Sequence, residues 1–371
     1  MAGKAYSYSM ALSKDNVAKV NVKSAGSFIN EVFNNYGYPS QITDLKITGP
    51  LNGTDIKNLR TAFDNLVTLD MSEVDIVEGG TEYYKTYTTV ADEFPAYFMR
   101  ESNLTNLESI ILPNSVTQIL YGSFVDNFSD DNGKPLSTYK LTKIVLGENL
   151  TKIGEIVFAC SMKSIHIPAS VTSIGGAAFG YCPNLETITV DEQNTAFKSH
   201  DGVLYWKETT KWVSGKGNVP AYTVTCCPPA KTSIEFPNDM LIYGVLYRGF
   251  SDCVNLTNIE LPEGVEYIGA AAFARCTALE KVTIPSTMTV NQSYGASSMF
   301  YDNPAMKELH LNTATPPQWY IYTGTASKSY LPTTCKLYVP NTAAWKGNDS
   351  YTSDYYKNWK NNFTIVIKYD Y

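Results

Sequence analysis

The fold is decided by Ala178-Phe179-Gly180-Tyr181-Cys182-Pro183-Asn184-Leu185, which recurs as Ala272-Phe273-Ala274-Arg275-Cys276-Thr277-Ala278-Leu279. Six phenylalanines occupy this short frame, and each is followed within three residues by a cysteine or an asparagine: Phe124, Phe158, Phe179, Phe250, Phe273 and Phe300. Such self-similarity at a regular spacing is typical of stacked units and not of a single globular core. The sequence therefore predicts a repeat array.

Each unit also carries a strand signal. The segments Leu107–Pro113 and Leu256–Pro262 alternate apolar and polar residues, which indicates a strand, and proline then ends it. A Val-x-x-Ile-Gly frame follows, as in Val265–Gly269, where glycine suits a corner of the chain. Equivalent positions such as Ile259 and Val282 lie 23 residues apart.

A strand with its turns in about 20–29 residues is typical of leucine-rich repeats. We expect an α/β-type but mostly β solenoid, a right-handed array with a continuous parallel sheet, few helices and a cap at each end. Twelve strands are predicted: Leu45–Ile47, Leu69–Met71, Ile110–Leu112, Ile144–Leu146, Ile165–Ile167, Ile188–Val190, Ile234–Phe236, Ile259–Leu261, Val282–Ile284, Leu309–Leu311, Leu337–Val339 and Ile365–Ile367.

The chain is expected to have three parts. Residues 1–40 form an N-terminal cap, with helical spacing of apolar residues over Ser27–Phe33. Residues 41–311 form the solenoid, irregular up to about residue 100, with an insertion at about 197–232 that holds a hairpin at Gly202–Trp206 and Lys211–Val213. Residues 312–371 form the last turns and a cap rich in aromatic residues, which either pack together or contact a ligand: Trp345, Tyr351, Tyr355, Tyr356, Trp359 and Phe363.

Composition restricts the class of protein. The 371 residues carry a net charge of −7 without a run of lysine or arginine, which argues against nucleic acid as a partner. No apolar stretch approaches the 20 or so residues of a membrane span, and Met1–Tyr6 lacks the apolar core of a secretory signal. Four of the seven cysteines follow the repeat, so we expect small buried hydrophobes and neither disulfides nor metal ligands. No cofactor is expected.

Taken together, these frames resemble the BspA-type leucine-rich repeat family over residues 41–311. The insertion Asp201–Tyr205 and the ending Leu337–Pro340, followed by Trp359 and Phe363, also resemble the family, whereas Phe158-Ala159-Cys160 is one residue short of its pattern. The resemblance implies a secreted or surface-anchored protein of a host-associated bacterium, since some relatives are adhesins for matrix proteins, plasma proteins or other bacteria. It implies no shared catalytic motif.

Candidate binding residues follow from the register of the strands. The residue between two buried positions faces the open side of the sheet. This rule selects His166, Thr189, Glu235, Glu260, Thr283 and His310 as ligand-binding candidates, within a row that also holds Lys46, Asp70, Ile111, Val145, Tyr338 and Val366. Two aromatic groups are further candidates, either as binding surfaces or as edge packing: Tyr83 and Tyr84 with Tyr87 and Tyr97, and Trp319 with Tyr320 and Tyr322.

Catalytic and metal sites are weakly indicated. Glu235 and Glu260 take matching positions on adjacent turns, about 5 Å apart, a separation that retaining glycosidases use. Two solvated glutamates are the favoured interpretation, because an open sheet supplies no pocket. The segment Asp126–Gly133 resembles a calcium loop, but Phe128 at a ligand position favours a plain acidic turn.

The sequence thus predicts a non-enzymatic, monomeric binding protein of the secreted or cell-surface kind. It would engage a host or microbial protein or glycan through the sheet face, and any attachment to a membrane would be through a lipid anchor outside this sequence. A carbohydrate-capture surface protein and a purely structural spacer are the alternatives.

Overall fold

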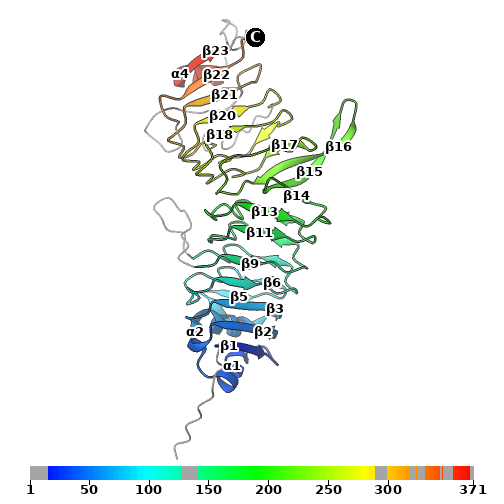
Figure 1. Cartoon of the computed structure of the whole chain (residues 1–371), viewed down its shortest axis with the longest axis vertical. Coiled ribbons are helices and arrows are strands. Elements are labelled where there is room, and N and C mark those ends of the chain that lie inside the picture. The colour runs from blue at the N-terminus through cyan, green and yellow to red at the C-terminus, as the bar shows by residue number, and fades with distance from the viewer. Residues whose placement is uncertain are drawn as a thin grey trace, which may run out of the picture. The chain divides into compact units, whose positions relative to one another are not determined.

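The computed structural model describes residues 16–126, 140–288, 299–317, 323, 331–342, 345 and 354–367. The chain divides into two compact units, Met1–Ser173 and Ile174–Tyr371. Each is a mostly β solenoid of stacked parallel strands with few helices (Figure 1). The predicted solenoid is confirmed.

The first unit is built on a sheet of five parallel strands. They are β1 (Val17–Asn21), β2 (Asp44–Leu51), β3 (Thr68–Ile76), β7 (Ser109–Ile111) and β9 (Lys143–Val145), and β11 (Ser164–Ile167) follows them along the chain. Side chains alternate across the sheet, so Leu45 and Ile47 are buried while Lys46 between them faces outward. All the strands predicted in this unit are present, and β1 extends the sheet into the region expected to be only a cap.

A second, shorter ladder of parallel strands runs along the first unit. It consists of β6 (Glu93–Phe94), β8 (Gln118–Ile119) and β10 (Lys152–Ile153), and the next copy of the frame is β12 (Ser173–Ile174). The sequence pattern indicated only a corner here. The residues before the glycine are in fact extended, and Gly154 N donates to Ile119 O at 2.9 Å. A side chain at Gly154 would place Cβ 2.9 Å from that same oxygen, which explains the glycine.

The helices of the first unit close its N-terminal end. The helix expected near Ser27–Phe33 is α1 (Phe28–Tyr36), followed by η1 (Pro39–Gln41) and α2 (Gly53–Ala62). The buried carboxylate of Asp55 joins α1 to α2, since it accepts from Phe28 N at 3.0 Å and from Asn52 N at 3.0 Å. The second bond is half of a capping box that begins α2.

The second unit has its own parallel sheet and short ladder. The sheet contains β18 (Asn258–Glu260), β20 (Lys281–Ile284), β21 (Glu308–Leu311), β22 (Lys336–Val339) and β23 (Thr364–Ile367). The short ladder contains β17 (Leu241–Val245) and β19 (Tyr267–Ile268), and β13 (Thr187–Val190) precedes both. The five strands of the sheet and β13 lie at predicted positions, whereas β17 and β19 were not predicted as strands.

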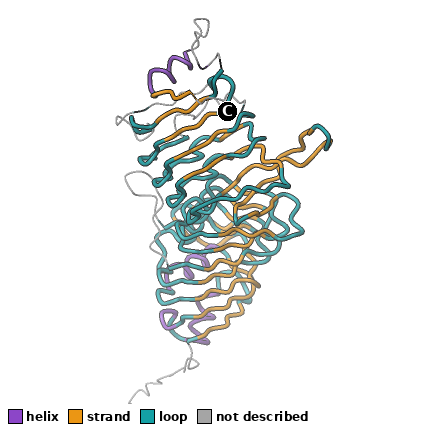
Figure 2. The backbone as a smooth tube through the Cα atoms, turned by 45° about the horizontal axis from the view of Figure 1, so that its top comes forward, coloured by secondary structure: helices purple, strands orange, loops and turns teal. Residues whose placement is uncertain are grey.

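A pair of hairpins replaces one regular turn of the second unit. Its strands are β14 (Phe197–His200), β15 (Val203–Val213) and β16 (Gly217–Cys226). The segments Gly202–Trp206 and Lys211–Val213 were expected to be the two arms of one hairpin. Apart from Gly202, both belong to the single strand β15. One turn lies at Asp201-Gly202, whose φ angles of 48° and 73° fit a two-residue type I′ turn, and the other lies near Gly215. The outer part of β15 and β16 projects away from the turns of its unit (Figure 2).

The strand predicted at Ile234–Phe236 is absent, which corrects the expectation of a continuous sheet. Backbone bonding explains its absence. The Asp201-Gly202 turn occupies the side of β13, where Ile188 N donates to Gly202 O at 2.9 Å. The amide of Glu235 is bound by the carboxylate of Asp201 at 3.1 Å in place of a neighbouring strand. The hairpin insertion therefore interrupts the ladder.

The phenylalanine frame forms stacked columns. Ring centres are 5.3 Å apart for Phe94 and Phe124 in the first unit, and 5.4 Å apart for both Phe250–Phe273 and Phe273–Phe300 in the second. Residues two positions before and after these rings often have left-handed backbone: Asp92, Gly122, Ile156, Ala177, Arg248 and Ala271 before, and Asp252, Arg275 and Asp302 after. Phe250 and Phe273 are thus each held between two sharp bends of the chain, and the other rings are flanked by one such bend.

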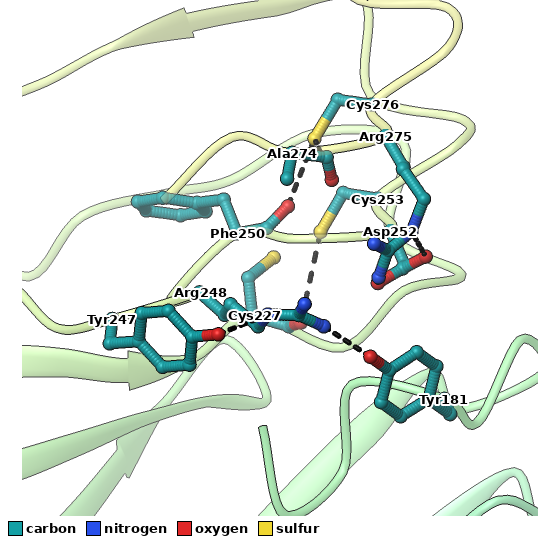
Figure 3. Close-up of polar contacts among 10 residues, drawn as sticks. All are labelled: Tyr181, Cys227, Tyr247, Arg248, Phe250, Asp252, Cys253, Ala274, Arg275 and Cys276. Atoms are coloured by element: carbon teal, nitrogen blue, oxygen red, sulfur yellow. Dashed lines mark hydrogen bonds and ion pairs between the residues drawn. The ribbon is translucent and has the colours of Figure 1, made fainter. Parts of the chain in front are cut away.

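The cysteine or asparagine of the frame has a hydrogen-bonding role. Cys276 Sγ donates to Phe250 O at 2.9 Å, and Asn303 Nδ2 donates to Phe273 O at 2.7 Å (Figure 3 shows the first bond). In both cases the acceptor is the carbonyl of the phenylalanine one turn earlier. The two residue types exchange because each supplies a donor to a buried carbonyl.

All seven cysteines are buried and free, and burial was expected for the four that follow the repeat: Cys160, Cys182, Cys253 and Cys276. Burial raises the pKa of the Cys226 and Cys335 thiols. Hydrogen bonding with Cys227 and Cys276 raises that of Cys253. Thiols of this kind are poor nucleophiles.

Aromatic residues near the C-terminus pack together beside α4 (Asp354–Asn362). Trp345, Trp359 and Phe363 are buried, and the two indole rings meet edge to face with centres 6.4 Å apart. Trp345 Nε1 donates to Thr313 O at 2.9 Å. Packing is therefore the role of these three rings, whereas the side chains of Tyr351, Tyr355 and Tyr356 lie outside the described residues.

Candidate functional site

The sheet face of the first unit changes character along its length. Lys46 and Asp70 are register partners, and Lys46 Nζ lies 3.4 Å from Asp70 Oδ2. Burial works to raise the pKa of Asp70, but bonds from Ser72 and the charge of Lys46 outweigh it and hold that pKa below its usual value. Farther along, Ile111 pairs with Val145, which is 38% exposed. The face thus runs from an ion pair to aliphatic side chains, and the predicted candidate His166 on β11 is exposed.

In the second unit the predicted row of outward residues is brought into register. Glu260, Thr283, His310, Tyr338 and Val366 are successive partners across β18, β20, β21, β22 and β23. The expectation that all of them face solvent is wrong, because Thr283 and His310 are only 6% and 9% exposed. Neighbouring side chains cover the middle of this row.

His310 is the centre of that covered region. Its ring is stacked on Tyr338 with ring centres 4.3 Å apart, and its Nε2 lies 2.8 Å from Glu308 Oε2. The hydrogen bond with His310 is the main cause that lowers the pKa of Glu308. This arrangement fixes the imidazole against its neighbours, and only 9% of the residue is exposed.

The other two candidates of this unit lie apart from the row. Thr189 on β13 is exposed. Glu235 is also exposed but belongs to no strand, so strand pairing does not place it beside Glu260. The strand register therefore does not build the carboxylate pair that a retaining glycosidase needs, and the expected spacing of about 5 Å loses the strand pairing on which it rested.

The tyrosine-rich stretch forms a compact cluster in the first unit. Strands β4 (Gly79–Tyr84) and β5 (Tyr87–Thr89) make a tight antiparallel hairpin in which Tyr84 and Tyr87 are partners. Ring centres lie 5.0 Å apart for Tyr87 and Tyr97, and 5.7 Å apart for Tyr97 and Tyr121. We call Tyr84, Tyr87, Tyr97 and Tyr121 the tyrosine cluster.

The members of this cluster differ in exposure. Tyr87 and Tyr121 are 38% and 39% exposed, whereas Tyr84 is 8% exposed and its neighbour Tyr83 is 3% exposed. The sequence left Tyr83 and Tyr84 as either a binding surface or edge packing, and their burial fits edge packing. Tyr83 donates its hydroxyl proton to Ala96 O at 2.9 Å. The accessible rings of the cluster are those of Tyr87 and Tyr121.

Arg60 of α2 organises the cluster from the inside. It is 2% exposed, and its guanidinium donates to the carbonyl oxygens of Tyr83, Phe98 and Arg100. The same group lies 5.1 Å from the ring centre of Tyr84, within the range of a cation–π contact. One buried side chain thus connects the hairpin to the following turn.

Two basic side chains lie over rings of the tyrosine cluster. Arg100 lies 5.5 Å from the ring centre of Tyr97, and Lys85 lies 5.2 Å from that of Tyr84. Burial, reinforced by the hydrogen bond with Tyr87, raises the pKa of Tyr97 to about 12. The Tyr97 phenol is therefore neutral at physiological pH. Glu101 lies 3.9 Å from Arg100 and accepts from the Tyr84 hydroxyl, so the surface offers aromatic area, hydroxyl groups and charges of both signs.

Sequence reasoning missed Tyr121, although its distance of 24 residues from Tyr97 is close to the repeat length and would have indicated contact. It also missed Trp212, which is 72% exposed on β15. The candidate Trp319 lies outside the described residues, as does most of the acidic turn after Asp126.

A second cation–aromatic group lies in the second unit (Figure 3). Arg275 forms a two-pronged ion pair with the buried Asp252, with distances of 2.7 and 2.6 Å. Arg248 bonds the hydroxyl of Tyr181, and its Nε lies 3.0 Å from the hydroxyl of Tyr247. These hydrogen bonds and ion pairs join side chains from successive corners of the chain. We therefore assign them to the stability of the fold and not to a ligand site.

Among the residues that the structure describes, no group of three His, Cys, Asp or Glu side chains is placed to hold a metal ion. Likewise, no helix in the described ranges is long and apolar enough to cross a membrane.

Known proteins resemble this chain in its repeats and in its fold. The family described as BspA type leucine rich repeat region matches in six copies, at residues 134–201 and 220–325. No curated protein matches the chain.

Three solved structures are similar. A leucine rich cell surface protein of Faecalibacterium prausnitzii is 17% identical, covering 100% of this chain and 96% of that one, with a TM-score of 0.47. A leucine-rich repeat protein of Eubacterium ventriosum is 18% identical over 79% of this chain and 80% of its own, with a TM-score of 0.42. One from Bacteroides ovatus is 20% identical over 75% and 64%, with a TM-score of 0.40.

Proposed function

This chain carries the repeats of the BspA-type leucine-rich repeat family, and from that premise we propose that it is a non-enzymatic binding protein that acts outside the cell, secreted or held at the surface. Its ligand is an extracellular protein. The tyrosine cluster is the observation that supports this function, and the exposed His166 on the sheet face of the same unit is a candidate for an additional contact.

The cluster has the properties of a protein-binding surface. Tyrosine gives a large, rigid and amphipathic contact area at a small cost in side-chain entropy. Tyr87 and Tyr121 are held by contacts with Tyr97, so little further ordering is needed when a ligand binds. Lys85, Arg100 and Glu101 place charges of both signs at the flanks, which favours a partner with complementary polar and charged groups around the aromatic contact.

The experiment is surface plasmon resonance of the whole chain against immobilised extracellular-matrix and plasma proteins. The variant Tyr87→Ser/Tyr121→Ser removes the two exposed rings, and Tyr38→Ser removes a ring that is 68% exposed outside the cluster. We expect the double variant to weaken binding at least tenfold, as rigid aromatic anchors usually contribute about 2 kcal/mol or more. The Tyr38 variant should bind like the unchanged protein.

Two outcomes would overturn the proposal. If the chain binds none of the immobilised proteins, protein binding is not its function, and a structural spacer becomes the better interpretation. If the cluster variant and the Tyr38 variant bind equally well, the tyrosine cluster is not the contact surface. A screen of glycoside substrates should show no hydrolysis that Glu235→Gln/Glu260→Gln removes.

A further inference from the structure

A polar groove lies in the first unit, at the end of the sheet where its strands begin. Its volume is about 660 Å³, within the usual range for ligand sites. Residues just before β2, β3 and β7 line it, namely Thr43, Val67 and Glu108. Asn65, Asn106 and Lys140 line it from the preceding loops.

The groove is regular because its walls belong to the repeat. Val67 N donates to Thr43 O at 2.7 Å, and Glu108 N donates to Val67 O at 2.8 Å. Each turn therefore follows the previous one at the strand spacing of about 4.8 Å. Polar side chains recur along the groove at that interval.

The amide groups are held in fixed orientations. Asn65 Nδ2 donates to Ser40 O at 2.8 Å, and Asn106 Nδ2 donates to Asp64 O at 2.8 Å. In both cases the amide nitrogen is tied to a backbone carbonyl of the preceding turn, so the amide oxygen is an oriented acceptor. Lys140 Nζ donates to Asn106 Oδ1 at 2.9 Å and keeps further N–H donors for a ligand.

The charges in the groove balance. Glu108 is the acidic lining residue and Lys140 the basic one, while the remaining lining residues are uncharged. Phosphate or sulfate groups are recognised by clusters of cations, which this lining lacks. Among the described lining residues Val67 alone is apolar, so these residues do not include the buried aromatic anchors that dominate protein interfaces.

We propose that this groove binds a neutral, extended oligosaccharide. Such a chain presents hydroxyl groups that both donate and accept, which suits amide oxygens, a carboxylate and an ammonium group. One pyranose ring of an extended glycan is similar in length to the strand spacing, so successive rings meet equivalent side chains on successive turns. The site is independent of the tyrosine cluster and of the protein ligand proposed above.

The test is isothermal titration of the whole chain with linear β-linked hexasaccharides of glucose, N-acetylglucosamine, mannose and xylose. We expect at least one probe to bind, and Asn65→Ala/Asn106→Ala to weaken that binding at least tenfold. Asn103→Ala is the matched control, because Asn103 Nδ2 makes the same kind of bond to Thr61 O without lining the groove. Thermal melting of each variant reports its folding.

Several results would overturn the proposal. They are the absence of binding by all four probes, an equal loss of affinity in the Asn103 variant, and a loss of most affinity on raising the salt concentration, since a neutral ligand binds with little salt dependence. Retention of glycan affinity by Tyr87→Ser/Tyr121→Ser would support it and would separate this site from the protein-binding surface.

Discussion

The guanidinium carbon of Arg60 lies 5.1 Å from the ring centre of Tyr84, beneath the rings that the tyrosine cluster exposes. Arg60 thereby joins α2 to the β4–β5 hairpin, and it donates to three backbone carbonyls from that hairpin and the following turn. The cluster depends on this one side chain for its shape.

Replacing Arg60 with methionine should therefore destabilise the first unit. Leaving buried carbonyls without donors costs about 1–3 kcal/mol for each group, so we expect a loss of roughly 2–4 kcal/mol once the loops relax. Urea unfolding followed by tyrosine near-ultraviolet circular dichroism measures both stability and ring packing. The exposed Lys57 on the same helix provides the control, since Lys57→Met should change stability by less than about 0.5 kcal/mol. Similar effects of the two substitutions would contradict this role.

Asn303 offers a test of the donor that the corner frame requires. Its Nδ2 bonds Phe273 O, while its Oδ1 is buried without a hydrogen-bond partner. Replacement by cysteine keeps a donor and removes the unpaired oxygen, so Asn303→Cys should leave stability unchanged or raise it. Replacement by valine removes the donor, so Asn303→Val should cost about 1–2 kcal/mol. Thermal unfolding of the two variants compares them, and equal melting temperatures would refute the exchange rule.

The sequence predicts the structural features that recur in successive repeats, and it fails at features that occur only once. Ile110 and Ile144 are predicted in strands because the same apolar pattern recurs at the repeat spacing, and the structure pairs them. Ile234 has the same pattern but forms no strand, because the turn at Asp201 takes the place of a neighbour. The sequence pattern around Ile234 does not show that a turn of the inserted hairpin will take the position of the neighbouring strand.

The candidate site shows the same limit. The register of Thr283, His310 and Tyr338 follows from the repeat and is confirmed, but their exposure was misjudged because stacking of His310 on Tyr338 covers the face. The tyrosine cluster was located by composition alone. Which of its rings are accessible depends on Arg60, whose contacts with residues about 40 positions away carry no signal in a single sequence.

Backbone strain at the corners provides a further prediction. Ala271 has a φ of 54°, a region that costs an L-residue about 1–2 kcal/mol and costs glycine little. Ala271→Gly should therefore stabilise the chain by about 0.5–1 kcal/mol, after the extra chain entropy of glycine is subtracted. Ala270→Gly is the same change at the adjacent residue, whose φ is not positive, and should destabilise by a similar amount. Calorimetric melting should shift in opposite directions for the two variants, and shifts in the same direction would contradict the prediction.

The contact between Glu308 and His310 makes a prediction about acid stability. The hydrogen bond with His310 lowers the folded-state pKa of Glu308 below its unfolded value of about 4.3. A carboxyl group with a lowered pKa stabilises the fold fully above the unfolded value and loses that contribution as the pH falls through the folded value. The melting temperature of the unchanged protein should thus exceed that of Glu308→Gln at pH 6, and the difference should shrink below pH 4. In a His310→Phe background, which keeps a ring stacked on Tyr338, Glu308→Gln should show little pH-dependent difference. A difference that persists unchanged in that background would show that another group, and not His310, holds the carboxylate.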